Sequence, residues 1–332
     1  MYIGIDIGGT NVRVAVVADG KILHLVKEST AEGVKTAGDF LQKLVRMIES
    51  IPNHRECKAI GIGVPGMIVD NKITTCRNFK VLVGYPLALN LEKHFKKPVH
   101  LQNDAKLATL GEALAGAGSK FNSVAYVGLG TGLGGGTVVN KKLFLGASCL
   151  GGYFSRIILD GAEIAENLVA GVGLSAQIQT ALGQEMSIKE FFAVASSKTP
   201  PAVASLGNGK PTIVSNVVDD SHPLSVYNYE ALKSLGEPKN SVYGHKALQG
   251  VLANFQRNLA NLLLNISVTL NPDAIILGGG IMDSSVHFID AVIKDFRTRA
   301  HDNAKQTQIL RVSLEYPGVI GATLFAQNPC IF

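Results

Sequence analysis

The fold of this chain is decided by a short N-terminal stretch, YIGIDIGGTNVRVAVV, at residues 2–17. Two β-rich runs, Tyr2–Ile7 and Val12–Val17, flank a glycine turn at residues 8–11, and this pattern predicts an antiparallel hairpin. A third β-rich run, Lys21–Val26, follows directly. The chain therefore opens with a small antiparallel sheet.

The same pattern recurs in the middle of the chain. Ser123–Leu129 and Gly135–Val139 are again β-rich and flank a glycine turn, with Gly130 lying 122 residues after Gly8. A repeat of this length exceeds the period of a solenoid, so it predicts two related halves.

Helical and strand patterns alternate between and after the two hairpins, as in an α/β fold. The expected further strands are Ala59–Val64, Val99–Leu101 and Ala274–Leu277. The expected helices are Thr36–Ile51, Leu87–Phe95, Ala105–Ala115, Lys246–Leu270, Ser285–Arg299 and Gly318–Gln327. Residues 196–244 are rich in Pro, Gly, Ser and Asn with weak periodicity, which indicates an insertion or a long surface excursion.

Composition narrows the class of protein. The 332 residues are 46% hydrophobic and 17% charged, enough for two domains with sizeable cores. The net charge is +5, but Lys and Arg are scattered, so we expect no nucleic-acid partner. No apolar run reaches the roughly 18 residues of a membrane span, and Asp6 interrupts the N-terminal apolar stretch where a signal peptide would need it. The four cysteines lack C-x-x-C spacing, which argues against a zinc site or a disulfide framework and favours a cytoplasmic location.

The first glycine turn has two interpretations. Gly8, Gly9 and Thr10 form either an ordinary hairpin turn or a phosphate site, because adjacent glycines leave backbone N–H groups open to an anion. In the second interpretation Asp6 holds a magnesium-bound water.

The second turn, Gly130-Thr131-Gly132, is followed by three more glycines at residues 134–136. Such a run is costly in backbone entropy, which indicates that a ligand or another backbone comes very close. Two such hairpins suit one polyphosphate. Neither turn is a Walker P-loop, because no Gly-Lys-Ser or Gly-Lys-Thr follows it.

Two further sites have a structural and a functional interpretation. Asn103-Asp104 lies at a strand-to-helix junction, where it either caps the helix or supplies a carboxylate that accepts a proton from an alcohol during phosphoryl transfer. Gly278-Gly279-Gly280 is either a tight turn or a place where adenine and ribose pass close to the backbone.

Taken together these residues resemble the ROK family, which contains repressors, uncharacterised reading frames and sugar kinases. The resemblance covers nearly the whole chain. It is carried by GIDIGGTN (residues 4–11), GIGVPG (61–66), Asn103-Asp104 with Gly111-Glu112, GLGTGLG (128–134), Asn271-Pro272 leading into Gly278–Gly280, and GVIGA (318–322).

The resemblance implies the two-domain, ribonuclease H-like ATPase fold of actin, Hsp70 and hexokinase. One lobe would comprise residues 1–117 plus 318–332, and the other residues 118–317. ATP with Mg²⁺ would lie between the lobes. The residues that would hold the phosphates and adenosine are Gly8, Gly9, Thr10, Asn11, Gly130, Thr131, Gly132, Gly278, Gly279 and Gly280.

The acceptor of this reaction would be a small-molecule sugar. By the same resemblance Asp104 is the general base, while Gly66, Asn78 and Asn103 contact the sugar. Family kinases carry a Gly-Glu-x-Gly-His motif after the second hairpin, whereas this chain has Gly152-Tyr153-Phe154-Ser155-Arg156. Tyr153 and Arg156 thus replace the usual acid and imidazole. A shortened segment then leads to Glu166, which aligns with a second sugar-contacting glutamate.

Without the family's cysteine cluster we expect no structural zinc. Replacing an acceptor group by a ring and a cation changes which hydroxyls the pocket satisfies, so Arg156 favours a sugar that carries an acyl or anionic group. The sequence therefore predicts an ATP-dependent hexose or N-acylhexose kinase resembling glucokinases.

Two alternatives remain at this point. The first is a catalytically weak or silent sugar-sensing protein of the same fold. The second, an ATPase acting on a protein partner, is disfavoured because no separate client-binding domain is visible. A family repressor is disfavoured too, because the chain begins directly with the first strand and not with a helix-turn-helix. A homodimer is an open expectation.

Overall fold

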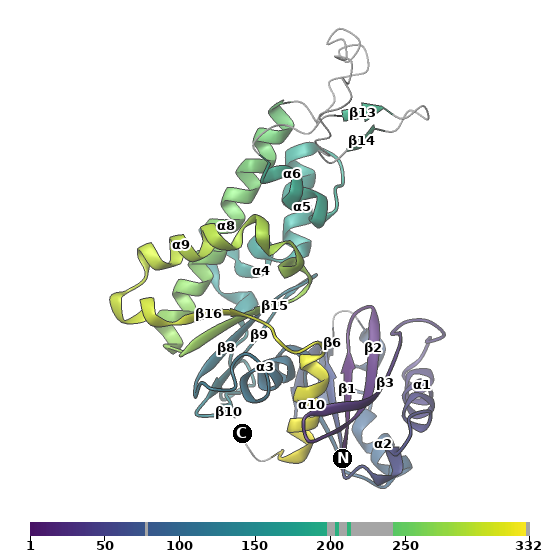
Figure 1. Cartoon of the computed structure of the whole chain (residues 1–332). Helices are drawn as coiled ribbons and strands as arrows, with labels where there is room; N and C mark the ends of the chain where they lie inside the picture. The colour runs from purple at the N-terminus through teal and green to yellow at the C-terminus, as the bar shows by residue number, and fades with distance from the viewer. Residues whose placement is uncertain (77–78, 198–202, 206–210, 214–241, 330–332) are drawn as a thin grey trace, which may run out of the picture.

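The computed structural model describes residues 1–76, 79–197, 203–205, 211–213 and 242–329. It is an α/β structure with two five-stranded sheets (Figure 1). The first sheet has the order β3-β2-β1-β4-β7. Its strands are β1 (Tyr2–Ile7), β2 (Asn11–Ala18), β3 (Lys21–Ser29), β4 (Ile60–Val64) and β7 (Val99–Asn103).

The second sheet repeats the architecture of the first. Its order is β10-β9-β8-β15-β16, with β8 (Val124–Leu129), β9 (Leu133–Val139), β10 (Lys142–Leu143), β15 (Ala274–Gly278) and β16 (Gln308–Arg311). Each sheet consists of an antiparallel meander followed by two parallel strands. The recurrence seen in the sequence is therefore a duplicated topology.

Helices cover both sheets (Figure 1). They are α1 (Ala37–Glu49), α2 (Leu87–Phe95), α3 (Asp104–Leu114), α4 (Ala165–Val169), α5 (Gly171–Leu182), α6 (Ile188–Ala195), α8 (Val242–Leu270), α9 (Ile289–Arg299) and α10 (Pro317–Gln327). Local signals start several of them: Thr36 and Asp39, for example, form a capping box at the start of α1. The helices α4 to α6 were not predicted from the sequence.

One predicted helix begins late. The pattern at Ser285–Arg299 indicated a single helix, but Gly280–His287 is a 3-10 helix and α9 starts at Ile289. Phe288 leaves helical geometry, with φ −145°, and buries its ring against Phe192 and Phe255. Tertiary packing of one aromatic ring overrides the local periodicity.

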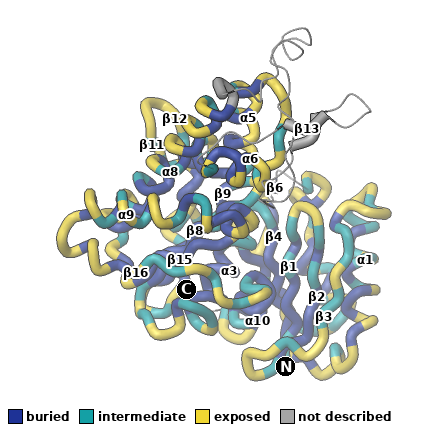
Figure 2. Tube along the Cα trace, turned by 45° about the horizontal axis from the view of Figure 1, so that its top comes forward, coloured by how far each residue is buried: buried dark blue, intermediate teal, exposed yellow. Residues whose placement is uncertain are grey.

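Each sheet has its own core, visible as the buried central strands in Figure 2. One core packs α1 and α2 against the first sheet. The other packs α4, α5, α6, α8 and α9 against the second sheet, with a group of phenylalanines in edge-to-face and tilted contact at Phe191, Phe192, Phe255 and Phe288.

The helices α3 and α10 connect the two halves. α3 follows the last strand of the first sheet but packs on β9 and β8 of the second, whereas α10 follows the last strand of the second sheet but packs on β1 and β4 of the first. The two helices also pack on each other. Their glycines permit this contact, since a Cβ on Gly321 would overlap the carbonyl of Leu107 and one on Gly111 would overlap the carbonyl of Pro317. The interface between the halves is thus a close helix crossing.

The segment predicted as an insertion, residues 196–244, lies mostly outside the described residues. Within it the structure describes β13 (Val203–Ser205), β14 (Pro211–Ile213) and the start of α8. No helix in the described part of the chain is both long and apolar enough to cross a membrane.

Candidate active site

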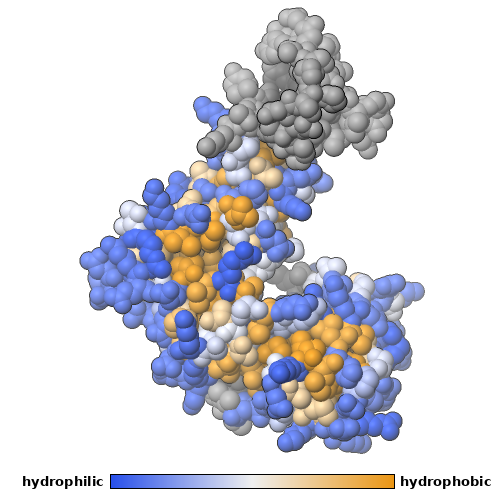
Figure 3. Space-filling model, viewed as in Figure 1, coloured by the Kyte–Doolittle hydropathy of each residue, from blue (hydrophilic) through white to orange (hydrophobic). Residues whose placement is uncertain are grey.

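The parallel strands of each sheet bring the predicted site residues to one edge. β1, β4 and β7 are parallel, so the hairpin after Ile7, the turn after Val64 and Asn103 all lie at their carboxyl ends. In the second sheet the hairpin after Leu129 and the loop at Gly278 lie at the equivalent edge. Figure 3 shows the surface hollowed between the two halves.

Two side-chain hydrogen bonds fix Asn103, the residue just before α3. Its Oδ1 accepts from the N–H of Lys106 at 3.1 Å, and its Nδ2 donates to the carbonyl of Gly66 at 3.0 Å. The capping interpretation therefore holds for Asn103. The same side chain also ties the Pro65-Gly66 turn to the helix, which places both beside Asp104.

Asp104 is the first residue of α3 and is packed from both halves. Its Cα lies 3.3 Å from where a Cβ on Gly63 of β4 would stand, and the Cβ of Ala105 lies 2.8 Å from where a Cβ on Gly134 of β9 would stand. Its Oδ1 accepts from the N–H of Ala105 at 2.8 Å. Burial, and then the nearby carboxylate of Asp6, raise the pKa of Asp104 to about 7.

Asp6 is the second carboxylate at this edge. Its Oδ2 accepts from Nη1 of Arg13 at 3.2 Å, and Gly318 at the start of α10 packs against its carboxyl group. Burial raises the pKa of Asp6, while the guanidinium of Arg13 opposes that shift. Two carboxylates that cannot both ionise freely suit a proton acceptor beside a cation-binding group.

The first glycine hairpin is braced from behind. The N–H of Gly8 donates to the carbonyl of Asn11 at 2.9 Å, and Oγ1 of Thr30 donates to the carbonyl of Gly8 at 2.8 Å. Gly9 and Thr10 at its tip are exposed. The tip is therefore held rigidly and remains open to a ligand.

The second hairpin is braced by α5. The N–H groups of Gly171 and Val172 donate to the carbonyls of Gly130 and Thr131, each at 2.9 Å. The side chain of Thr131 is exposed. This hairpin is also held from behind and open at its tip.

The three glycines after the second hairpin have a structural explanation. A Cβ on Gly135 would lie 2.6 Å from the carbonyl oxygen of Gly152, and one on Gly136 would overlap the side chain of Thr109 on α3. Of the two possibilities that the sequence left open here, close approach of protein segments explains these positions.

The loop after β15 lies beside the second hairpin, because Gly278 pairs with Gly128. Gly279 has φ +87°, and a Cβ there would overlap the backbone of Leu129. Gly280 is exposed, and a Cβ on it would meet open space. The tight-turn interpretation accounts for Gly279, while Gly280 leaves room for a ligand.

The residues that depart from the family pattern lie further along the chain. Tyr153 and Arg156 are exposed at a short 3-10 helix, Phe154–Arg156. Glu166 lies on α4, where its Oε2 accepts from the N–H of Leu133 at 3.3 Å beside Gly132. The carboxylate aligned with a sugar-contacting glutamate therefore touches the second hairpin. Asn78 lies outside the described residues.

Sequence reasoning missed two residues at this edge. Lys106 is almost fully buried on α3 and donates from Nζ to the carbonyl of Cys149 at 2.6 Å. Arg13 pairs with Asp6 across the β1–β2 ladder, and it could have been found from the register of the predicted hairpin. No local signal distinguishes Lys106 from a surface lysine.

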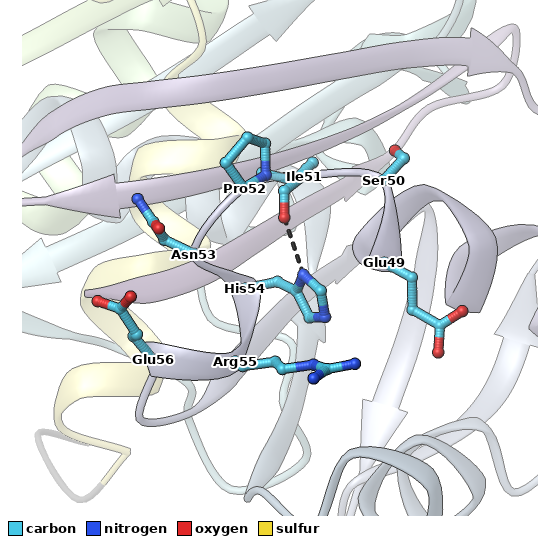
Figure 4. A pocket seen from close by; sticks show the side chains of 8 residues that line it. All are labelled: Glu49, Ser50, Ile51, Pro52, Asn53, His54, Arg55 and Glu56. Atoms are coloured by element: carbon cyan, nitrogen blue, oxygen red, sulfur yellow. Dashed lines mark hydrogen bonds between the residues drawn. The ribbon is translucent and has the colours of Figure 1, made fainter.

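A surface hollow elsewhere carries none of the predicted site residues. It lies at the turn after α1, where Nδ1 of His54 is 2.8 Å from the carbonyl oxygen of Ile51 (Figure 4). The residues lining it are Glu49, Ser50, Ile51, Pro52, Asn53, His54, Arg55 and Glu56. Among the described residues there is no group of three or more His, Cys, Asp or Glu side chains placed to hold a metal ion.

Comparison with known proteins shows which family this chain resembles. The model of the ROK family matches residues 2–218 and 240–328. The chain is 34% identical to a glucokinase of Thermotoga maritima over 162 residues, which is 48% of this chain and 50% of that relative. It is 24% identical to an N-acetylmannosamine kinase of Haemophilus influenzae, over 89% of this chain and 86% of the relative.

A solved structure extends the likeness to nearly the whole chain. The ROK family glucokinase of Streptomyces griseus, in complex with glucose and AMPPNP, superposes with a TM-score of 0.69 at 25% identity, over 98% of this chain and 99% of that one. The likeness confirms the fold that the sequence predicted, the two-domain ATPase fold of actin, Hsp70 and hexokinase.

Proposed function

The chain belongs to the ROK family, and on that premise we propose that it transfers the terminal phosphoryl group of ATP to a hydroxyl of a hexose or N-acylated hexose. The observation that carries the proposal is the carboxyl group of Asp104. Asp104 follows the carboxyl end of β7, parallel to the strand that leads into the first hairpin, and the next residue, Ala105, packs against Gly134 after the second hairpin. Its pKa of about 7 suits a base that works near neutral pH.

The proposed reaction needs one proton acceptor and one electrophile. As the sugar oxygen forms its bond to the γ-phosphorus, the bond from that phosphorus to the bridging oxygen of ADP breaks and Asp104 takes the hydroxyl proton. Protonation of Asp104 also relieves its repulsion with Asp6. Closure of the two halves would exclude water and favour the sugar over hydrolysis.

Asp6 fits the role of a group that holds Mg²⁺ through a bound water. Its carboxylate is a hard oxygen donor at the base of the first hairpin, and burial raises its pKa, so a bound cation there would offset the cost of its ionised form. When bound with ATP, the ion would neutralise phosphate charge.

The remaining site residues keep the roles proposed from the sequence. The phosphates and adenosine would contact Gly8, Gly9, Thr10, Asn11, Gly130, Thr131, Gly132, Gly278, Gly279 and Gly280. The sugar would contact Gly66, Asn78, Asn103, Tyr153, Arg156 and Glu166.

Three wider expectations are kept as proposals. The lobes would be residues 1–117 plus 318–332 and residues 118–317, with α3 and α10 forming the crossing between them. The protein would act in the cytoplasm, and a homodimer remains an open expectation.

The proposed class of sugar rests on residues 152–156, the segment that departs from the family motif. Exposed Tyr153 and Arg156 offer a ring and a guanidinium where family kinases present an acid and an imidazole. A ring packs on an acyl methyl group and a guanidinium pairs with a carbonyl or carboxylate oxygen, so an N-acylated hexose suits this wall. The Haemophilus relative is named for such a substrate.

The test is ADP release from Mg-ATP with a panel of hexoses, N-acetylhexosamines and anionic sugars. We expect release with at least one panel member, and the preference should change in Arg156→Ala. A protein that binds a panel sugar in calorimetry without releasing ADP would be the silent sensor of the alternative hypothesis. An unchanged preference in Arg156→Ala would remove the argument for an acylated or anionic acceptor.

A further inference from the structure

Lys106 is a buried cation on the helix that carries Asp104. Its residue is only 2% exposed, and it lies two positions after Asp104. Burial lowers the pKa of Lys106, which reflects the cost of removing an ammonium group from water. A methionine of similar length would fill this space without that cost, so the charge calls for an explanation.

The ammonium group donates to the loop that leads into the altered segment. We define the acceptor loop as residues 144–153. Nζ of Lys106 lies 2.6 Å from the carbonyl oxygen of Cys149 in its middle. Among the described residues this is the side-chain hydrogen bond that joins α3 to the loop.

The acceptor loop is tightly turned. Cys149, Gly146 and Gly152 all have positive φ, at 57°, 71° and 74°. The N–H of Gly151 donates to the carbonyl of Leu145 at 2.7 Å, and Gly152 packs directly on Gly136. A loop with this backbone needs outside contacts to keep one conformation.

The loop also exposes apolar groups. Phe144, Leu150 and Tyr153 are 46%, 50% and 38% exposed. The loop is thus bonded to the Asp104 helix and also carries exposed apolar side chains that a ligand could contact. Its last residue, Tyr153, opens the segment proposed to contact the sugar.

We infer that Lys106 is a positioning residue that fastens the acceptor loop to α3 and so sets the distance between the sugar wall and Asp104. The inference rests on the proposed function. Bonds from an ammonium group to a carbonyl are stronger than neutral ones, and a shift of about 1 Å in a substrate wall costs up to 10²-fold in rate. Burying Lys106 costs free energy, and in return its hydrogen bond holds the wall of the pocket in one position.

The test compares Lys106→Met with Lys97→Met. Nζ of Lys97 donates to the carbonyl of Arg55 at 2.8 Å in a different part of the first half, so the control loses the same kind of bond. Two measurements are made on both variants: hydrogen exchange of residues 144–153, and affinity for sugar and for ATP by calorimetry with the matching KM and kcat values.

We expect Lys106→Met to speed exchange in the acceptor loop and to raise the sugar Kd and KM by about tenfold or more. Its KM for ATP should stay within about threefold of wild type, and Lys97→Met should change neither sugar quantity. Unchanged exchange in the loop, or equal weakening of sugar and ATP, would overturn the inference and leave Lys106 a packing residue.

The outcomes also separate this inference from the proposed function. If the wild-type protein neither binds a panel sugar nor releases ADP, the proposed function fails and the sugar role of Lys106 fails with it. If wild type is an active kinase and Lys106→Met leaves sugar affinity intact, only the inference about Lys106 is wrong.

Discussion

Asp104 and Asp6 illustrate how single residues acquire unusual chemistry from their neighbours. An isolated aspartate has a pKa near 4, but burial and a second carboxylate raise the pKa of Asp104 to about 7. Asp6 avoids part of this effect because Arg13 donates to it. Asp104 can therefore exchange a proton near neutral pH, whereas the charge of Asp6 is partly balanced by the guanidinium of Arg13.

The role of Asp104 as base predicts a large loss of turnover in Asp104→Asn. The amide cannot accept the sugar proton, so kcat should fall by about 10²- to 10⁴-fold. The hairpins are untouched, so the Kd for ATP should stay within a few fold in calorimetry. A variant that retains near wild-type turnover would contradict the assignment.

The raised pKa of Asp104 also predicts a pH dependence of the rate. The base works only when ionised, so kcat/KM for the sugar should fall below about pH 7, approaching tenfold per pH unit well below it. The measurement is a pH profile from about 5 to 9 at saturating Mg-ATP. An acid limb near pH 4 would mean that Asp104 is not the group that titrates.

The same shift predicts that Asp104 destabilises the folded protein when ionised. The folded-state pKa is raised above the ordinary value of 3.8, so the folded form binds the proton more tightly, and stability falls as pH rises from about 4 to about 7. Asn at this position does not titrate. Asp104→Asn should therefore be more stable than wild type at pH 8, by up to a few kcal/mol at about 1.4 kcal/mol per pKa unit.

The measurement for this prediction is thermal unfolding of both proteins without nucleotide at pH 8 and pH 5. The advantage of Asp104→Asn should shrink at the lower pH. A difference in melting temperature that stays constant between these two pH values would show that the ionisation of Asp104 is not linked to folding.

At the scale of elements, glycines decide how closely helices and strands approach. In the first sheet, Gly4 on β1 and Gly61 on β4 let α10 approach closely. In the second sheet, Gly134 and Gly136 on β9 let α3 approach in the same way. The two helices then cross at Gly111 and Gly321. These positions are structural, in contrast to the open glycines at the hairpin tips.

The element scale yields a matched pair of glycine substitutions. In Gly321→Ala the new methyl group would overlap the backbone of Leu107, so α3 and α10 must separate, and we expect a loss of about 1–3 kcal/mol or more. Gly250 lies exposed within α8, where a Cβ meets nothing within 4 Å, so Gly250→Ala should gain about 0.4–1 kcal/mol.

Chemical denaturation of both variants tests this pair. Opposite signs are the expected result. Stabilisation, or no change, in Gly321→Ala would mean that the helix crossing is not closely packed in solution.

At the scale of the whole molecule, the chain passes between its halves at two places, after α3 and before α10. Glu112, fully buried on α3, accepts bonds at both. Its carboxylate accepts from the N–H of Ala117 at 2.9 Å and from those of Ser313 and Leu314 at 3.0 and 2.9 Å. One side chain thus ties both connections to the same helix, and this gives a structural role to the Gly111-Glu112 motif.

We therefore predict that Glu112→Gln loosens the connection between the halves. The amide NH₂ would face N–H donors, and a buried charged acceptor is lost, so unfolding free energy should fall by about 1.5–3 kcal/mol or more. Glu190→Gln is the control, because Glu190 also accepts from a backbone N–H but lies exposed in the capping box of α6.

Two measurements check the Glu112 prediction. Denaturation gives the loss of stability, and small-angle scattering with and without ATP and sugar shows whether the halves still adopt one arrangement. Equal effects of the Glu112 and Glu190 substitutions would indicate that the two connections are not held by this carboxylate.

The sequence by itself determined the fold class, the repeated hairpins and most strands and helices, because these follow from local periodicity, glycine turns and family motifs. It placed Tyr2–Ile7 and Leu87–Phe95 at their observed bounds. It also singled out Asp104, although both a capping and a catalytic interpretation stayed open there.

Only the tertiary structure decided what depends on contacts between distant parts of the chain. These are the proximity of Asp6 to Asp104, the burial of Lys106 against Cys149, the position of Glu166 at the second hairpin and the start of α9 after Phe288. A pKa, a buried charge and a packed ring depend on neighbours more than 30 residues away, and no local pattern encodes which neighbours those are.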